Sequence, residues 1–201
     1  CLEALIGIAC GVRSELPELS QNIEYEVVRS QEDWKQLIDG EIECIKSEEK
    51  ESRLIFPGTF NPLHEGHLKI KELAEEKTQE ELVFEISVSN VDKAPLSFYE
   101  IKKTIDQFSD DQQWILTNAS TFQQKVKLFP KSIFVVGTDT LMRIFDEQYY
   151  QDQTTMNQAL DCFNEYDARF IVFGREINKN FLSLDDLEIP SFVRDRFKGV
   201  K

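Results

Sequence analysis

The sequence predicts an α/β protein built on a doubly wound sheet of about five parallel strands with helices on both faces. Three observations lead to this fold class. After residue 50, short apolar runs alternate with longer segments of helical periodicity. The apolar runs are nearly continuous, which is typical of strands that helices bury on both sides. The chain has 201 residues, of which 41% are hydrophobic, and that is enough for one sizeable core.

Residues 1–50 are expected to form a helical lead-in. The stretch CLEALIGIACG carries apolar residues at helical spacing and stops at Gly11. We interpret it as the end of an upstream domain, also because the chain begins with Cys1. The other expected elements are a short alternating stretch at 23–28, a helix over 30–45 that Ser30 caps and Gly40 interrupts, and a charged linker or solvated helix end at 46–53.

Residues 51–201 form the main domain, which we expect to be cut short at its C-terminus. Strands and helices alternate through it, so we expect parallel βαβ units with ligands bound beyond the carboxyl ends of the strands. The expected strands cover 53–56, 82–89, 114–117, 132–137 and 169–174, and the expected helices cover 67–77, 98–108, 119–129 and about 139–165.

Composition and charge exclude several classes of protein. The formal net charge of −14 disfavours nonspecific nucleic-acid binding, because a polyanion would be repelled. No apolar run approaches the roughly 18 residues of a membrane span, and no secretory signal is visible. We therefore expect a cytoplasmic protein without nucleic-acid or membrane partners, and nothing indicates an oligomeric state. The cysteines lack a CxxC pair and are expected to be reduced thiols: Cys1, Cys10, Cys44 and Cys162.

The stretch FPGTFNPLHEGH contains both histidines of the chain, His64 and His67. It lies where the first strand ends and the first helix of the main domain begins, which is the favoured ligand site of a parallel sheet. Gly58 allows backbone amides to approach an anion, and Gly66 leaves space between the imidazoles. His67 falls in the first turn, where the helix dipole favours phosphate. Two imidazoles there are suited to a phosphorus whose oxygens gain charge in a transition state.

Other interpretations of the two histidines fit less well. Their i, i+3 spacing is not that of HExxH and no third ligand is evident, so we expect no metal site. A Walker loop would need Gly-Lys-Ser/Thr. Two structural histidines in a turn remain an alternative.

Residues 53–77 resemble the signature of the nucleotidyltransferase superfamily, which includes nicotinamide- and nicotinate-mononucleotide adenylyltransferases and cytidylyltransferases. The family motif is Gly-(Thr/Ser)-Phe-(Asp/Asn)-Pro-x-His-x-Gly-His, and GTFNPLHEGH matches every fixed position. The resemblance implies a Rossmann-like fold in which His64 and His67 contact the nucleotide phosphates and stabilise the transition state. It also implies Mg²⁺ carried by those phosphates. The residues implied to line the phosphate and substrate site are Gly58, Thr59, Phe60 and Asn61.

Three further stretches extend the resemblance. NVDKAPLS (90–97) resembles a loop whose lysine reaches the phosphates, which would be Lys93. VVGTDTLMR (135–143) resembles a Gly-x-Asp segment in which Gly137 lies at the nucleotide and Asp139 binds a ribose, although Asp139 could also be a helix N-cap. FGR (173–175) supplies Arg175, which either binds a phosphate or completes an ion pair.

LTNASTF and FPKSIFVVGTDTLMRIFDEQYY are similar to a subgroup of nucleotidyltransferases that often follows a domain like nicotinamide-nucleotide amidase. The helix over 1–11 resembles the last helix of such a domain. The resemblance implies that a nucleoside triphosphate is joined to a phosphorylated small-molecule acceptor with release of pyrophosphate. By this analogy the reaction is adenylyl transfer to nicotinamide mononucleotide, in NAD biosynthesis. A cytidylyltransferase and a non-catalytic nucleotide-binding module are the alternatives.

The superfamily has a second signature, a Ser/Thr-rich stretch followed by an Arg, which binds the triphosphate opposite the histidines. In residues 186–201, Ser191 and Arg194 have a similar spacing, but Pro190 and Phe192 replace the polar neighbours. We interpret this stretch as a surface segment. The signature is expected either beyond residue 201 or not at all, which would leave the phosphate site open on one side and the activity of this fragment reduced.

Overall fold

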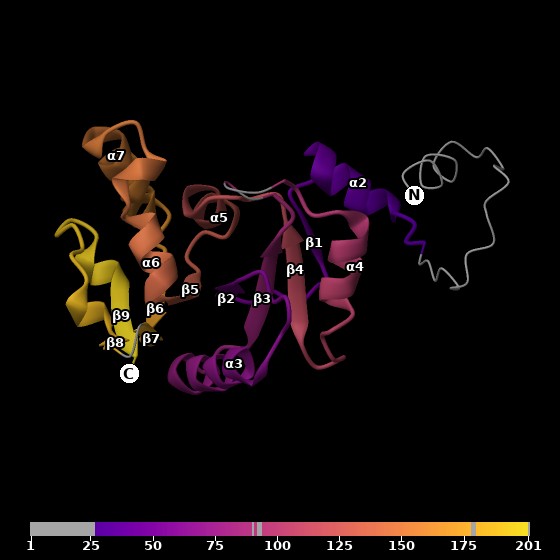
Figure 1. Ribbon diagram of the computed structural model, residues 1–201, viewed down its shortest axis with the longest axis horizontal. Coiled ribbons are helices and arrows are strands. Elements are labelled where there is room, and N and C mark those ends of the chain that lie inside the picture. Colours follow the sequence, from indigo (N-terminus) through magenta and orange to yellow (C-terminus); the bar gives the residue numbers. More distant parts are fainter. Residues whose placement is uncertain (1–26, 90, 92–93, 178–179, 201) are drawn as a thin grey trace, which may run out of the picture.

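The structure is a computed structural model that describes residues 27–89, 91, 94–177 and 180–200. Its centre is a seven-stranded sheet in the order β1-β4-β3-β2-β5-β6-β9 (Figure 1). The strands are β1 (Cys44–Lys46), β2 (Leu54–Pro57), β3 (Leu82–Ser87), β4 (Gln113–Thr117), β5 (Ile133–Gly137), β6 (Arg169–Phe173) and β9 (Phe197–Val200). A separate antiparallel pair consists of β7 (Arg175–Ile177) and β8 (Asn180–Leu182).

Six neighbouring strands of the sheet are parallel, and β1 runs antiparallel to β4 at one edge. All five strands expected from the sequence are present, so the prediction of a doubly wound α/β fold is confirmed. From β2 the chain first builds outward through β3 and β4, and then returns to the other side of β2 with β5, β6 and β9. The order therefore reverses between β2 and β5, and such a switch point is where open parallel sheets bind ligands.

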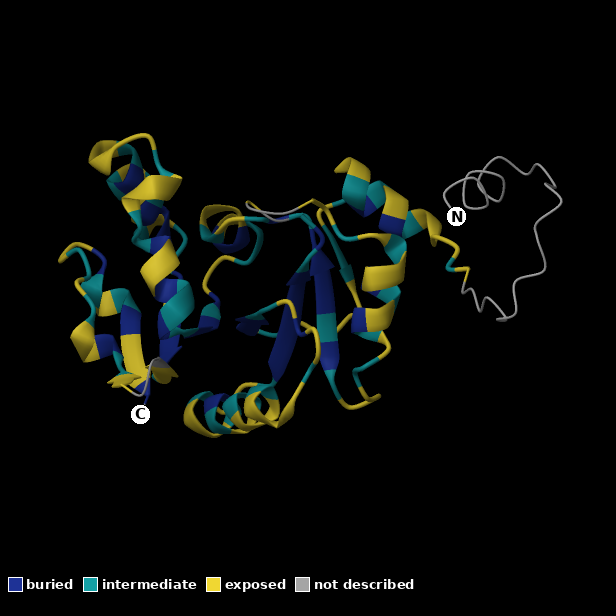
Figure 2. Ribbon diagram, viewed as in Figure 1, coloured by how far each residue is buried: buried dark blue, intermediate teal, exposed yellow. Residues whose placement is uncertain are grey.

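Helices cover both faces of the sheet, and the central strands between them are mostly buried (Figure 2). The strand residues alternate between two cores. Leu54 and Phe56 point into one core and Ile55 into the other. The first core is covered by α2 (Glu32–Asp39), α3 (Glu65–Thr78) and α4 (Phe98–Ile105). The second is covered by α5 (Phe122–Leu128), α6 (Thr138–Ile144) and α7 (Gln153–Glu165). Three short 3-10 turns complete the described elements: η1 (Glu147–Tyr149), η2 (Leu184–Asp186) and η3 (Arg194–Arg196).

The helix expected over 30–45 is wrong in its second half. Helix α2 follows Gln31, not Ser30, and ends at Gly40, which adopts a left-handed conformation with φ of 76°. The amide of Gly40 donates to carbonyls of the last turn, which is the usual way for glycine to terminate a helix. The chain then turns and forms β1 on the edge of the sheet. The helix expected over 1–11 lies outside the described residues, as does most of the stretch 23–28.

The C-terminal stretch is more than the surface segment expected. Strand β9 pairs with β6 in parallel, and Phe197, Val200 and Val193 are buried. Because β9 runs parallel to β6, its last residue Val200 is level with Phe173, at the carboxyl edge of the sheet.

Helix boundaries differ from the expected ones where side chains cap the helix ends. Helix α5 begins at Phe122, not near residue 119, because the Thr121 hydroxyl accepts the Gln124 amide and the Gln124 side chain accepts the Thr121 amide. The helical region expected over 139–165 is two helices, and Asp152 caps the second one through the Thr155 amide.

Candidate active site

A cavity of about 540 Å³ opens at the carboxyl edge of the sheet, at the switch point between β2 and β5. The β2–α3 loop forms its floor. The ends of β3, β5 and β6 and the start of α5 form its walls. Eight of the residues expected at the site line this one cavity: Gly58, Thr59, Phe60, His64, His67, Gly137, Asp139 and Arg175.

The two imidazoles lie face to face at the start of α3. Their ring centroids are 3.7 Å apart and the planes differ by 20°. His64 is the N-cap residue of α3 and His67 is in its first turn, so both lie at the positive end of the helix dipole. His64 is exposed, whereas His67 is partly buried and packs edge-on against Phe60 with a centroid distance of 5.0 Å.

His67 is arranged as a neutral hydrogen-bond donor. The His64 amide donates to its Nδ1 at 3.3 Å, and a neutral imidazole whose Nδ1 accepts carries its hydrogen on Nε2. Burial, together with smaller effects of the neighbouring His64 and Arg175, lowers the pKa of His67 to about 4. At neutral pH, Nε2–H is therefore available to an anionic oxygen without a charge on the ring.

Aromatic packing fixes the shape of the loop between β2 and α3. Phe60 has a positive φ of 41° and is 1% exposed, and its ring packs edge-on against Phe56 and Phe84. A Cβ at Gly58 would lie 2.5 Å from the Phe60 ring, so only glycine fits there. Gln107 holds the loop from outside, donating to the Phe60 carbonyl at 2.9 Å and accepting the Leu63 amide at 2.7 Å.

Gly66 leaves room for an imidazole, but not between the rings as the sequence suggested. A Cβ at Gly66 would lie 3.0 Å from His64 Cε1, so the room is needed beside His64. The two rings themselves are in direct contact.

Asp139 and Arg175 form an ion pair on the opposite wall, with Arg175 Nη1 2.8 Å from Asp139 Oδ2. The N-cap alternative for Asp139 is wrong, since Gly137 holds that position in α6. A Cβ at Gly137 would lie 2.5 Å from Asp139 Oδ1, so the glycine makes room for the carboxylate. Arg175 is thus in an ion pair in this structure, and its positive charge is also close enough to lower the pKa of His67.

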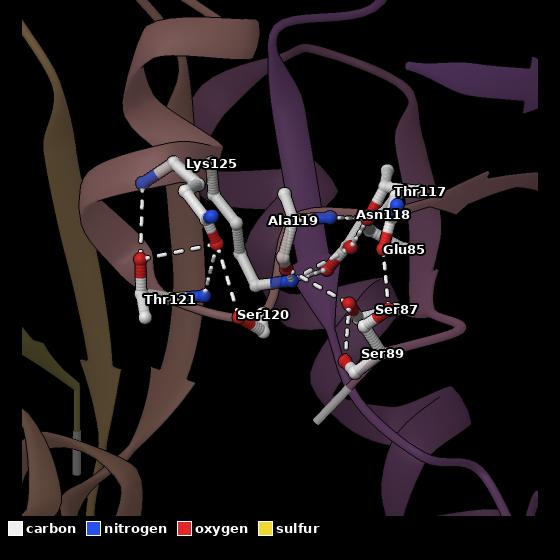
Figure 3. A network of polar contacts seen from close by, with 10 residues as sticks. Glu85, Ser87, Ser89, Thr117, Asn118, Ala119, Ser120, Thr121 and Lys125 are labelled. Atoms are coloured by element: carbon white, nitrogen blue, oxygen red, sulfur yellow. Dashed lines mark hydrogen bonds and ion pairs between the residues drawn. The ribbon is translucent and has the colours of Figure 1, made fainter. Parts of the chain in front are cut away.

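A buried ion pair that the sequence did not reveal forms the third wall (Figure 3). Glu85 of β3 and Lys125 of α5 both line the cavity, and Lys125 Nζ lies 2.7 and 2.8 Å from the two carboxylate oxygens. Lys125 also donates to the Ala119 carbonyl at 2.7 Å. The side chain of Glu85 is 0% exposed and that of Lys125 is 7% exposed.

One described residue that was expected at the site does not line the cavity. Asn61 is exposed and does not line it, and neither do Ser191 and Arg194. Arg194 donates to the Phe197 carbonyl at 3.2 Å instead. Lys93 lies outside the described residues.

The charges on the described cavity walls cancel, because Lys125 and Arg175 each face a carboxylate. Among the described residues, no group of three or more His, Cys, Asp or Glu side chains could hold a metal ion. An anion in this cavity would therefore be held by the helix dipole, backbone amides and neutral donors, supplemented by the exposed Arg175 if it leaves Asp139.

A second pocket of about 360 Å³ adjoins the cavity and shares three of its lining residues: Ser120, Phe122 and Thr140. Its walls include Tyr149, Tyr150 and Arg143, and the Arg143 guanidinium lies 5.6 Å from the Tyr149 ring centroid. The residues 119–122, at the start of α5, thus separate two adjoining spaces, and we call them the partition.

Comparison with known proteins agrees with this geometry. A family described as cytidylyltransferase-like matches residues 55–186, which span β2 to η2 and include every described wall of the cavity. No curated protein was found to match the chain. None of the helices within the described ranges has the length and apolar character needed to cross a membrane.

Proposed function

Because the chain belongs to the cytidylyltransferase-like family of nucleotidyltransferases, we propose that it joins a nucleoside triphosphate to a mononucleotide with release of pyrophosphate. The observation that carries the proposal is the stacked pair of His64 and His67 at the N-terminus of α3, on the floor of the switch-point cavity. The acceptor we propose is nicotinamide mononucleotide or a related compound, with ATP as the donor.

In this proposal the two histidines act on the α-phosphate of the triphosphate. An acceptor phosphate oxygen attacks the α-phosphorus, the bond to the bridging oxygen breaks, and pyrophosphate leaves. Negative charge on the α-phosphate oxygens grows during the transfer, and imidazole N–H groups at the positive end of a helix stabilise it. The neutral state of His67 suits this role, because its donor is preorganised and loses little hydration on binding.

Mg²⁺ is proposed to enter with the triphosphate and to neutralise part of its charge. The chain's own carboxylates at the cavity, Glu85 and Asp139, are both engaged with cations. Because both carboxylates already have cationic partners, the phosphates and water molecules would supply most of the ligands of the Mg²⁺ ion.

The second pocket is the proposed place of the acceptor's base. Its volume of about 360 Å³ and its tyrosine and apolar walls suit a flat aromatic ring. It adjoins the phosphate cavity at Ser120, so a mononucleotide could extend from one space to the other. We propose that Asp139, on the far wall, binds a ribose hydroxyl. By the sequence resemblance, Lys93 is proposed to reach the phosphates.

Pyrophosphate release by the full-length protein tests the proposal. ATP and CTP are each supplied with nicotinamide mononucleotide, nicotinate mononucleotide, choline phosphate or glycerol 3-phosphate. Release with ATP and a pyridine mononucleotide supports the proposal, and release with CTP and an alcohol phosphate would replace it with cytidylyl transfer. Tight triphosphate binding without release in any combination would favour a non-catalytic nucleotide-binding module.

A further inference from the structure

The Glu85–Lys125 pair has more polar partners than a simple ion pair between strand and helix (Figure 3). The Glu85 carboxylate also accepts the hydroxyl hydrogen of Thr117 on β4. Lys125 Nζ donates to the Ala119 carbonyl, which the Ser87 hydroxyl also contacts at 2.9 Å. The network therefore ties β3, β4, α5 and the partition together at one point.

Burying this pair is costly for the fold. Both charges lose their hydration, and a buried ion pair often contributes no more stability than apolar side chains of the same shape. Elsewhere on α5, Val126 is buried in the second core and Phe122 packs against it. An apolar pair at 85 and 125 would extend that core, so stability alone does not account for the charges.

The position of the pair indicates what it does. Lys125 reaches back along its own helix to Ala119, the first residue of the partition, and so fixes the start of α5 against β3. The main chain of Glu85 accepts the Gly58 amide at 2.9 Å, which joins the same strand residue to the phosphate-binding loop. Glu85 thus connects the histidine loop on one side with the partition on the other.

We propose that Glu85 and Lys125 are positioning residues that set the partition relative to the β2–α3 loop, and thereby align the acceptor phosphate with the α-phosphorus. The inference rests on the proposed function for the identity of the two ligands. Neither side chain touches the reacting atoms. All three ammonium hydrogens of Lys125 have partners in the Glu85 carboxylate and the Ala119 carbonyl, so the ammonium holds the partition and does not serve as a phosphate ligand.

The test compares three variants of the full-length protein. Lys125→Met leaves the Glu85 carboxylate buried without its cation and is expected to lower the melting temperature. Glu85→Leu combined with Lys125→Met replaces both charges with apolar groups and is expected to recover stability. Glu85→Asp keeps both charges and withdraws the carboxylate by one methylene, which provides a milder change in case the others fold poorly. Lys69→Met with Glu72→Leu removes an exposed pair on α3, away from the cavity, as the control.

The expected result is a separation of stability from acceptor use. The double variant should regain stability, yet its kcat/KM for the acceptor should stay about 10²-fold below that of the wild type, because a small misplacement of reacting groups costs that much. The KM of the double variant for the triphosphate should change little. The control should lose neither stability nor kcat/KM for the acceptor. Recovery of activity together with stability would overturn the inference. A loss confined to triphosphate binding would also overturn it, since Lys125 would then be a phosphate ligand.

Amide hydrogen exchange tests the positioning role independently of whether the protein transfers a nucleotide. If the wild type transfers no nucleotide, the proposed function fails, and the positioning role is judged from the amides of residues 119–122. Faster exchange there in Glu85→Asp and in the double variant, with unchanged exchange in α3, supports the role. Unchanged exchange in the partition contradicts it.

Discussion

The His64 amide donates to Nδ1 of His67 at 3.3 Å while the two rings stack with centroids 3.7 Å apart. In this hydrogen bond the backbone of His64 is the donor and the ring of His67 is the acceptor. It fixes the orientation of the His67 ring and the position of its hydrogen, and it places the donor Nε2–H on the side away from the His64 amide. The first turn of α3 therefore presents a donor of set geometry to the cavity.

The first prediction separates the two nitrogens of His67. In His67→Asn the side-chain oxygen can replace Nδ1 but nothing replaces Nε2, whereas in His67→Gln the amide nitrogen can reach the position of Nε2. We expect turnover of His67→Asn to fall about 10²- to 10³-fold, as for loss of one donor to a developing oxyanion. His67→Gln should retain more activity. Steady-state pyrophosphate release checks both, with melting temperatures as the control. Equal activity of the two variants would contradict a role for Nε2–H.

The second prediction concerns stability against pH. The pKa of His67 is about 4 in the folded protein, below its usual value near 6.5. Between pH 6.5 and 4 the unfolded chain binds a proton at His67 that the folded chain does not, so stability falls as the pH is lowered through this window. Above pH 6.5 His67 is neutral in both states and contributes no pH dependence.

His67→Gln cannot titrate, so its melting temperature should fall less than that of the wild type between pH 7 and pH 5. The carboxylates titrate alike in both proteins, and the difference isolates the histidine. Parallel curves over the whole range would mean that the imidazole is not shifted. Scanning calorimetry at half-unit pH steps measures the effect.

The third prediction addresses the ion pair between Asp139 and Arg175. Their side chains are 46% and 63% exposed, so the pair should contribute only about 0–1 kcal/mol to stability. We expect Arg175→Met to weaken the binding of ATP and of inorganic tripolyphosphate to a similar extent. Asp139→Asn should weaken ATP if the carboxylate binds a ribose, and should leave tripolyphosphate unchanged or tighter because Arg175 is released. Titration calorimetry with both ligands distinguishes these results. Unchanged binding in Arg175→Met would make the pair purely structural.

The sequence predicted the strands around the site well because their signals are local. The five apolar runs, the glycine-rich turn and the histidine spacing are each complete within a short window. Glu85 and Lys125 were missed for the opposite reason. Glu85 interrupts an apolar strand and Lys125 is one of two lysines on a polar helix, and 40 residues separate them along the chain. Their pairing depends on how α5 packs on β3, which no local pattern encodes.

The misplaced elements are short edge strands. Cys44–Lys46 and Phe197–Val200 have three and four residues, and so few positions cannot show a clear alternation. Gly40 was interpreted as an interruption, although a glycine at the end of an amphipathic turn is a signal for the helix to stop. Asn61 illustrates a different limit, because a motif position can be matched in sequence while its side chain is exposed outside the cavity.

The last prediction uses two glycines of the β2–α3 loop to separate stability from activity. A Cβ at Gly58 would lie 2.5 Å from the ring of Phe60, which is buried among other aromatic rings and cannot move aside. Gly58→Ala should therefore lower the free energy of unfolding by about 1–3 kcal/mol, the usual cost of overpacking. A Cβ at Gly66 would lie 3.0 Å from His64 Cε1, but His64 is exposed and its ring can shift.

Gly66→Ala should keep or slightly raise the melting temperature, because alanine favours the helix by up to about 1 kcal/mol over glycine. Its turnover should nonetheless fall, since the shifted His64 ring no longer stacks on His67. Thermal unfolding and pyrophosphate release on both variants give the comparison. If Gly66→Ala is as active as the wild type, the position of the His64 ring does not matter to the reaction, and the helix dipole and His67 would have to hold the phosphate without it.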